Sequence, residues 1–143
     1  MGNGWALRKW NVDAEVSEKD LFLIQHADYQ AQMFGLELTD ILPEPKLFLK
    51  EGDVISVGNT KLLTIEVPGH SPGGLAFYCA EEHLLFAGDV LFRGSYGRTD
   101  LPGGNTAELF NSIRQKLLCL PEETVVLCGH GSPTTIRAEK LNF

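Results

Sequence analysis

The chain has 143 residues, of which 43% are hydrophobic and 22% are charged, and its formal net charge is -7. This length predicts a single domain, residues 1–143, with enough chain for a real core. The composition argues against a disordered chain and against a membrane span. Because phosphate binding requires clustered Lys and Arg, the acidic balance also argues against a nucleic-acid partner.

Three cysteines, Cys79, Cys119 and Cys128, form an odd number without Cys-x-x-Cys spacing. The first and last lie inside apolar runs, which favours reduced thiols packed in a core over disulfides or metal ligands. No basic segment followed by an apolar stretch marks a secretory signal. We therefore expect a cytoplasmic protein.

The N-terminal part of the chain predicts helices. Residues 3–10, with two tryptophans, are expected to form a short helix. A Ser-x-x-Asp start signal at Ser17 precedes apolar residues that recur at helical spacing until Gly35, which predicts a helix over residues 17–34. Residues 40–45 contain two prolines and are expected to form a loop.

Further along, the pattern changes to the alternation that is typical of strands. Short runs rich in Val, Ile, Leu and Phe are separated by turn residues, and they predict a strand meander and one later strand. Residues 93–105, with four glycines and a proline, are expected to form a surface or site loop. Thr106 is expected to cap a helix that stops at Pro121. The predicted strands are residues 53–57, 61–67, 75–79, 84–87 and 124–127.

Three polar residues, His70, Asp89 and His130, each follow a glycine at the end of a predicted strand. If these strands share a sheet and a direction, the three side chains meet at one edge. Two imidazoles and a carboxylate are donors that zinc or iron accepts in hydrolytic sites, where the metal lowers the pKa of bound water to about 7. A lone His beside Gly is more often a loop or core residue, but the shared placement predicts a metal site.

A serine hydrolase is the second interpretation of the same stretch. Residues 69–73 match the Gly-x-Ser-x-Gly nucleophile elbow, and Ser71, Asp89 and His130 follow the Ser, Asp, His order of α/β-hydrolases. An elbow requires a helix directly after its serine, whereas the sequence after Ser71 predicts a turn and a strand. The elbow is therefore the weaker interpretation.

Three longer motifs make the pattern specific: PGHSPGG at residues 68–74, FAGDVLFRGSYGRTDLPGGN at 86–105 and LCGHG at 127–131. In this order they resemble the metallo-β-lactamase superfamily, and within it the glyoxalase II-like hydrolases. The resemblance covers residues 3–143. It implies an α/β fold that is half of an αββα sandwich, with one mixed or antiparallel sheet and flanking helices.

The resemblance also implies roles for the three candidate ligands. His70 corresponds to the third histidine of the first metal, Asp89 to the catalytic carboxylate that bridges both metals, and His130 to the last histidine of the second metal. The family's His-x-His-x-Asp-His motif is absent, since the other histidines are His26 and His83, which we interpret as solvated. We expect the chain to begin just after that motif and to be a partial domain.

The family's activity implies metal-dependent hydrolysis of a thioester or related acyl bond, with zinc, iron or manganese. Because most metal ligands are absent, we expect this chain alone to be incomplete or inactive, and a second copy or a missing N-terminal half to supply the rest. A non-catalytic homodimer is the alternative. Tyr96 and Arg98 are candidate substrate contacts, although an Arg98 pair with Asp100 that holds a surface loop explains the same pattern.

Overall fold

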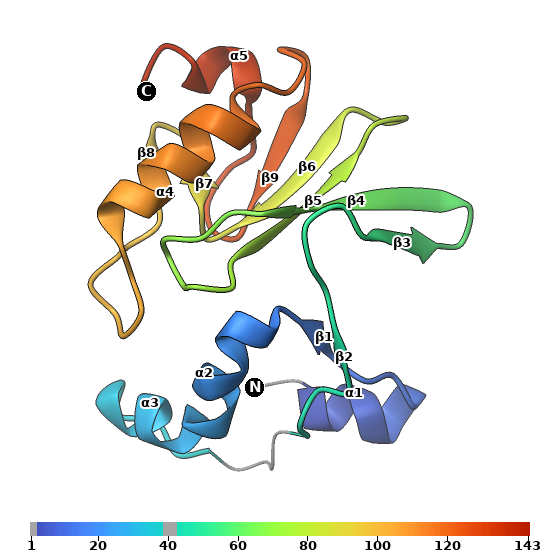
Figure 1. Cartoon of the computed structure of the whole chain (residues 1–143), viewed down its shortest axis with the longest axis vertical. Helices are drawn as coiled ribbons and strands as arrows, with labels where there is room; N and C mark the ends of the chain where they lie inside the picture. Colours follow the sequence, from blue (N-terminus) through green and yellow to red (C-terminus); the bar gives the residue numbers. More distant parts are fainter. Residues whose placement is uncertain (1–2, 39–42) are drawn as a thin grey trace. The chain divides into compact units, whose positions relative to one another are not determined.

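The computed structural model describes residues 3–38 and 43–143. The chain divides into two compact units, Met1–Leu49 and Lys50–Phe143, each of which is described by itself (Figure 1). The single domain expected over residues 1–143 stays a prediction. In the part of the chain that the structure describes, no helix is long and apolar enough to cross a membrane.

The first unit consists of short helices and one two-residue strand pair. Ser17 begins the helical region as predicted, because its side chain accepts a hydrogen bond from the Lys19 backbone. The prediction of one continuous helix over residues 17–34 is wrong, since the backbone at His26 leaves helical geometry, with φ -113° and ψ 26°, and separates two helices. The elements are α1 (Asn3–Trp10), β1 (Glu15–Val16), the 3₁₀ helix η1 (Glu18–Asp20), α2 (Leu21–Gln25), α3 (Ala27–Met33) and β2 (Leu47–Phe48), which pairs in parallel with β1.

The helical region of the first unit ends where the sequence predicts. Gly35 adopts the left-handed conformation, with φ +67°, that commonly closes a helix. Of the loop expected at residues 40–45, residues 40–42 lie outside the described residues, and residues 43–45 form no regular element. His26 is exposed as expected, and its Nδ1 lies 2.8 Å from the carbonyl oxygen of Phe22.

The second unit is built on a six-stranded mixed sheet with strand order β10-β9-β6-β5-β4-β3 (Figure 1). β3 to β6 form the predicted meander, and β6 pairs in parallel with β9. The predicted α/β fold, a mixed sheet with flanking helices, is confirmed. The strands of this sheet are β3 (Val54–Val57), β4 (Thr60–Glu66), β5 (Leu75–Cys79), β6 (Leu84–Gly88), β9 (Val125–Cys128) and β10 (Thr134–Thr135).

The segment between β6 and the next helix differs from the expected irregular loop. It opens with a small hairpin, in which β7 (Leu91–Phe92) pairs with β8 (Ser95–Tyr96). Asn105, and not Thr106, caps the helix, because the Asn105 side chain accepts hydrogen bonds from two backbone N–H groups of the first turn. The helix is α4 (Thr106–Ser112), which continues as the π-helical turn η2 (Ile113–Leu117).

One face of the sheet forms the core. Leu85 and Ala87 of β6 are fully buried, whereas Phe86 between them points to the opposite face and is 41% exposed. The buried face packs against α4, η2 and α5 (Ile136–Glu139) through Leu109, Ile113, Leu117 and Ile136. Each fully buried side chain of this size stabilises the fold by about 1.5–3 kcal/mol. The strand ends that follow are thereby attached to a well-packed scaffold.

The opposite face of the sheet is apolar and more open. Phe77, Phe86 and Leu127 form a row across β5, β6 and β9, since Phe86 is the register partner of the other two residues. All three side chains retain exposed surface. We call these three residues the apolar row. It lies on the face opposite the packed helices, where half of an αββα sandwich, as the resemblance implies, lacks its second sheet.

Candidate metal centre

Three strands of the sheet bring the predicted ligands to one edge. β4 and β6 are both antiparallel to β5, and β6 is parallel to β9, so β4, β6 and β9 run in one direction. His70, Asp89 and His130 follow the carboxyl ends of these strands. Their side chains converge: Asp89 Oδ2 lies 3.2 Å from His130 Nε2 and 4.0 Å from His70 Nε2.

His70 is oriented by a hydrogen bond from its other ring nitrogen. Nδ1 of His70 lies 2.7 Å from the backbone carbonyl oxygen of Arg98. A carbonyl oxygen only accepts hydrogen bonds, so Nδ1 carries the proton and donates it. The neutral ring then has its lone pair on Nε2, the nitrogen that faces Asp89. Histidines that ligate metals are commonly fixed in this way.

His130 is less constrained than His70. The His130 side chain is 78% exposed, against 26% for His70. Its ring lies edge-on to Phe92 of β7, with 6.1 Å between the ring centroids. The Asp89 carboxylate, 34% exposed, therefore faces the His70 ring, which a hydrogen bond orients, and the His130 ring, which is open to solvent.

Two glycines allow the backbone to approach Asp89. A Cβ atom at Gly129 would overlap Oδ1 of Asp89, and a Cβ atom at Gly97 would overlap the Asp89 backbone oxygen. The Gly97 position also lies close to the His70 ring, since a Cβ there would be 3.4 Å from Nδ1. In the sequence, Gly129 is conspicuous because it directly precedes His130. Gly97 is one of several glycines in residues 93–105, and nothing else in the sequence indicates its role.

The donor set fits part of a metal site. Imidazole and carboxylate are ligands that zinc, iron and manganese accept. His70 Nε2 and Asp89 Oδ2 are both acceptors, and a cation between two facing acceptors satisfies both. Among residues 3–38 and 43–143, however, no group of three or more His, Cys, Asp or Glu side chains is arranged to hold a metal ion. The role of His70, Asp89 and His130 as metal ligands therefore stays a prediction.

Tyr96 and Arg98, the predicted substrate contacts, both interact with other side chains. The Arg98 guanidinium donates two hydrogen bonds of 2.7 Å to the Asp100 carboxylate. These bonds are the main reason that the pKa of Asp100 falls to about 2, and Asp100 in turn raises the pKa of Arg98. The Tyr96 ring lies edge-on to Phe110, with 4.8 Å between centroids. The suggested Arg98 pair with Asp100 is therefore present, and contact of Tyr96 or Arg98 with a substrate stays a prediction.

Ser71 lies in a turn that leads into a strand. The backbone N–H groups of Gly69 and Gly74 both donate to the Ser71 carbonyl oxygen, which closes this turn. The chain then enters β5, where a nucleophile elbow requires a helix. This arrangement weakens the serine-hydrolase interpretation, in which Ser71 is the nucleophile.

His83 and the three cysteines of the second unit are not among the candidate metal ligands, and the structure shows where each of them lies. His83 lies in the exposed turn between β5 and β6, as predicted, and its Nδ1 is 3.9 Å from Glu123 Oε1. Cys79, Cys119 and Cys128 are all free, as predicted, but the predicted core position is wrong for Cys119, which is exposed. Burial raises the pKa of the Cys128 thiol, which favours the protonated form and a packing role for this residue.

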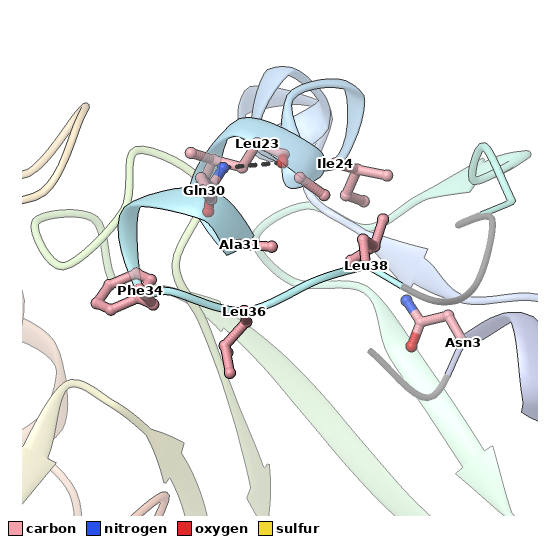
Figure 2. A pocket seen from close by; sticks show the side chains of 9 residues that line it. Asn3, Leu23, Ile24, Gln30, Ala31, Phe34, Leu36 and Leu38 are labelled. Carbon is pink, nitrogen blue, oxygen red and sulfur yellow. Dashed lines mark hydrogen bonds between the residues drawn. The ribbon is translucent and has the colours of Figure 1, made fainter.

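A pocket of about 360 Å³ lies in the first unit and was not predicted (Figure 2). Figure 2 shows Leu23, Phe34 and Leu36 among its apolar lining, and Gln30 Nε2 donates a 2.9 Å hydrogen bond to the Leu23 carbonyl oxygen. The nine side chains drawn there are all uncharged. The lining therefore supplies shape and apolar surface, and the candidate ligands belong to the second unit.

Comparison with known proteins shows what the chain is similar to. A family model described as the metallo-beta-lactamase superfamily matches residues 2–130. The hydroxyacylglutathione hydrolase GloC of Haemophilus influenzae is 42% identical over 124 residues, and the probable metallo-hydrolase YqgX of Bacillus subtilis is 40% identical over 135 residues. The crystal structure of TTHA1623 in a di-iron-bound form is similar with a TM-score of 0.82 at 38% identity.

These matches cover most of this chain but only part of each relative. They span 87% of this chain and 58% of GloC, and 92% of this chain and 63% of YqgX. For TTHA1623 the shares are 97% of this chain and 67% of that chain. The chain therefore spans about three fifths of the length of these curated relatives.

Proposed function

Because this chain belongs to the metallo-beta-lactamase superfamily, we propose that it carries part of the centre of a metal-dependent hydrolase of the glyoxalase II type, which acts on a thioester or a related acyl bond. The convergence of His70 Nε2 and His130 Nε2 on one oxygen of Asp89 is the observation that carries the proposal. The name of a relative at 42% identity, a hydroxyacylglutathione hydrolase, supports the substrate class.

In this proposal the imidazoles of His70 and His130 and the carboxylate of Asp89 hold the metal, and Asp89 is the catalytic carboxylate. Zinc, iron and manganese are the candidates, and the di-iron-bound form of TTHA1623 supports iron beside zinc. A metal bound there supplies a Lewis acid that polarises an acyl carbonyl and lowers the pKa of a water ligand to about 7.

The chain's own residues prepare this centre. The Arg98 carbonyl oxygen keeps the His70 lone pair on Nε2, on the side of Asp89. We propose that Tyr96 and Arg98 border the acyl substrate, because both lie on the segment that supplies this carbonyl and Tyr96 is 42% exposed. The open side of His130 is the natural direction of approach, since 78% of that side chain is exposed.

We further propose that His70, Asp89 and His130 bind one metal ion, and that the complete, active centre needs additional ligands from outside these 143 residues. The described residues hold a partial donor set, and the chain spans 58% of GloC. A second copy, or a polypeptide that corresponds to the remainder of the relatives, would supply the ligands and cover the apolar row. The alternative is a non-catalytic protein that dimerises through this row.

We also propose a cytoplasmic location. Cys79, Cys119 and Cys128 are free thiols, and such thiols persist where the compartment is reducing. Fractionation of the producing cell under conditions that trap thiols tests this. A chain recovered with oxidised cysteines from outside the cytoplasm would contradict it.

Elemental analysis of protein purified without a histidine tag tests the metal centre. We expect bound zinc, iron or manganese in the wild-type protein and a large loss in Asp89→Asn and His130→Gln. A thioesterase assay follows, alone and with added N-terminal polypeptide from a relative, and we expect a chelator to abolish any turnover. Equal metal content in wild type and Asp89→Asn overturns the proposal.

The same preparation separates the two alternatives. Turnover that survives a chelator and is lost in Ser71→Ala would favour the serine hydrolase. Sedimentation velocity of wild type and of Phe86→Asp tests whether the apolar row forms a dimer interface, and metal content and turnover of that dimer then distinguish a hydrolase completed by a second copy from the non-catalytic homodimer. A metal-free, inactive dimer would favour this second function.

A further inference from the structure

We infer that Asp100 is a positioning residue for His70: by holding Arg98 it directs the Arg98 carbonyl oxygen at Nδ1 of His70 and so sets which nitrogen of that ring is free. Asp100 is not a ligand candidate itself, and it acts through the backbone of its neighbour. The effect of Asp100 on metal affinity rests on the proposed function. The effect of Asp100 on the His70 tautomer does not.

The contacts form a chain of two links. Asp100 accepts two 2.7 Å hydrogen bonds from Arg98, one on each carboxylate oxygen. The Arg98 carbonyl oxygen lies 2.7 Å from His70 Nδ1. A bidentate bridge between residues two apart in the sequence restrains the backbone dihedrals between them. These dihedrals include ψ of Arg98, which decides where its carbonyl oxygen points.

Backbone hydrogen bonds anchor both ends of the segment that contains Arg98 and Asp100. The ion pair between these two residues therefore restrains only a short length of backbone. The Gly97 backbone N–H donates to the Val90 carbonyl oxygen at 3.2 Å, and the Asn105 N–H donates to Gly69 at 2.8 Å. Residues 98–104 lie between these two anchors. A change at Asp100 is therefore expected to be absorbed within this segment, where the Arg98 carbonyl lies.

An exposed ion pair usually contributes little to stability, and this one is exposed. Its proposed role is accordingly local. Loss of the Arg98 carbonyl as acceptor removes one hydrogen bond from His70, which changes the ratio of the two neutral tautomers by about fivefold. The free ring in water has the proton mostly on Nε2, so the shift is toward a ring whose Nε2 can no longer accept a metal.

The test is the tautomer of His70 in metal-free protein at a pH where the ring is neutral, read by two-bond ¹⁵N–¹H correlation of the imidazole. We expect the Nδ1–H form in wild type and a shift of about fivefold toward Nε2–H in Asp100→Asn. Arg98→Lys keeps the charge and the carbonyl but loses the two-point bridge, so it should show the same shift.

Glu122→Gln is the matched control, because Glu122 also takes part in an exposed pair, with Arg137 at 3.4 Å. It removes the same charge from the surface and should leave the His70 tautomer unchanged. An unchanged tautomer in Asp100→Asn, or an equal shift in Glu122→Gln, overturns the inference. Amide spectra of each variant confirm that the fold is retained.

Zinc titration by competition with a chromogenic chelator then connects the positioning role to the centre. We expect Asp100→Asn and Arg98→Lys to bind zinc about tenfold more weakly than wild type, the lower end of what supporting residues contribute. If wild type binds no zinc but the tautomer shifts as expected, the proposed function fails and the inference stands. If zinc binds and no variant shifts the tautomer, the inference fails alone.

Discussion

The two units of the chain differ in how they bury their apolar residues. In the second unit, the packed face of the sheet and the helices against it share a core in which Leu85, Leu109 and Ile113 are fully buried. In the described residues of the first unit, Ala31 and Pro45 are the buried apolar side chains. Large apolar residues there, such as Trp10 and Met33, are more than half exposed.

The difference explains where the candidate centre lies. Residues that must hold a fixed geometry are best attached to a well-packed scaffold. His70, Asp89 and His130 all follow strands of the second unit's sheet. The first unit instead exposes apolar surface, which is typical of an interaction surface.

The largest effect is expected from Ile113→Ala, which deletes a fully buried side chain at the start of η2. We expect the free energy of unfolding to fall by about 2–5 kcal/mol. Met33→Ala in the first unit is the matched control, because Met33 is 53% exposed, and its cost should stay below about 1 kcal/mol. Urea denaturation followed by far-UV circular dichroism measures both. Equal costs would remove the distinction between the two units.

Asp89→Asn should abolish most metal binding by the second unit. The change removes the one carboxylate that faces both imidazoles. The loss of affinity should exceed the roughly 10–100-fold that supporting residues contribute. Asp28→Asn, an equivalent change in α3 of the first unit, should leave zinc affinity unchanged in the same competition titration. Zinc binding that depends equally on Asp28 and Asp89 would contradict the assignment of the centre.

Gly129→Ala should disturb the centre by crowding. The added Cβ overlaps Asp89 Oδ1 and approaches the Gly88 backbone, so Asp89 must move, at a cost of about 1–3 kcal/mol. Gly35→Ala in the first unit meets open space, and its cost of about 1 kcal/mol comes from the positive φ alone. Zinc affinity separates the two variants, because only Gly129→Ala should lower it.

A smaller effect is expected in thiol chemistry within the second unit. Cys119 is exposed, whereas Cys128 is partly buried and burial raises its pKa. Ellman's reagent at pH 8 should therefore modify Cys119 several-fold faster, because the thiolate is the reacting form. The rates in Cys119→Ser and Cys128→Ser assign the two phases. A faster reaction at Cys128 would show that this strand end is open in solution.

The smallest effect concerns the pH dependence of the Arg98 pair with Asp100. The folded-state pKa of Asp100, about 2, lies below its ordinary value of 3.8. The interaction therefore stabilises the folded state above about pH 4 and is lost as the pH falls toward 2. A ¹³C carboxyl titration of Asp100 should show its midpoint near 2 in wild type and close to the ordinary value in Arg98→Met. Equal midpoints would mean that the pair does not form in solution.

Local pattern alone predicted much of the second unit. Short runs rich in Val, Ile, Leu and Phe between turn residues predicted the strands of the meander and β9. A glycine at the end of a predicted strand precedes His70, Asp89 and His130, and this shared placement predicted the three candidate ligands. The longer motifs predicted the family. A Ser-x-x-Asp start at Ser17 and a left-handed Gly35 likewise marked where the helical region of the first unit begins and ends.

Tertiary structure decided what depends on neighbours distant in the sequence. The break at His26, the cap at Asn105 and the short β7-β8 hairpin are local features, and the sequence did not predict them because competing local conformations differ little in intrinsic propensity. The orientation of His70 depends on a carbonyl 28 residues away. Gly97 is required only because the Asp89 backbone lies against it. The sequence by itself determined which side chains reach the sheet edge, and the fold determined how they face one another, because orientation is fixed by contacts that spacing along the chain does not encode.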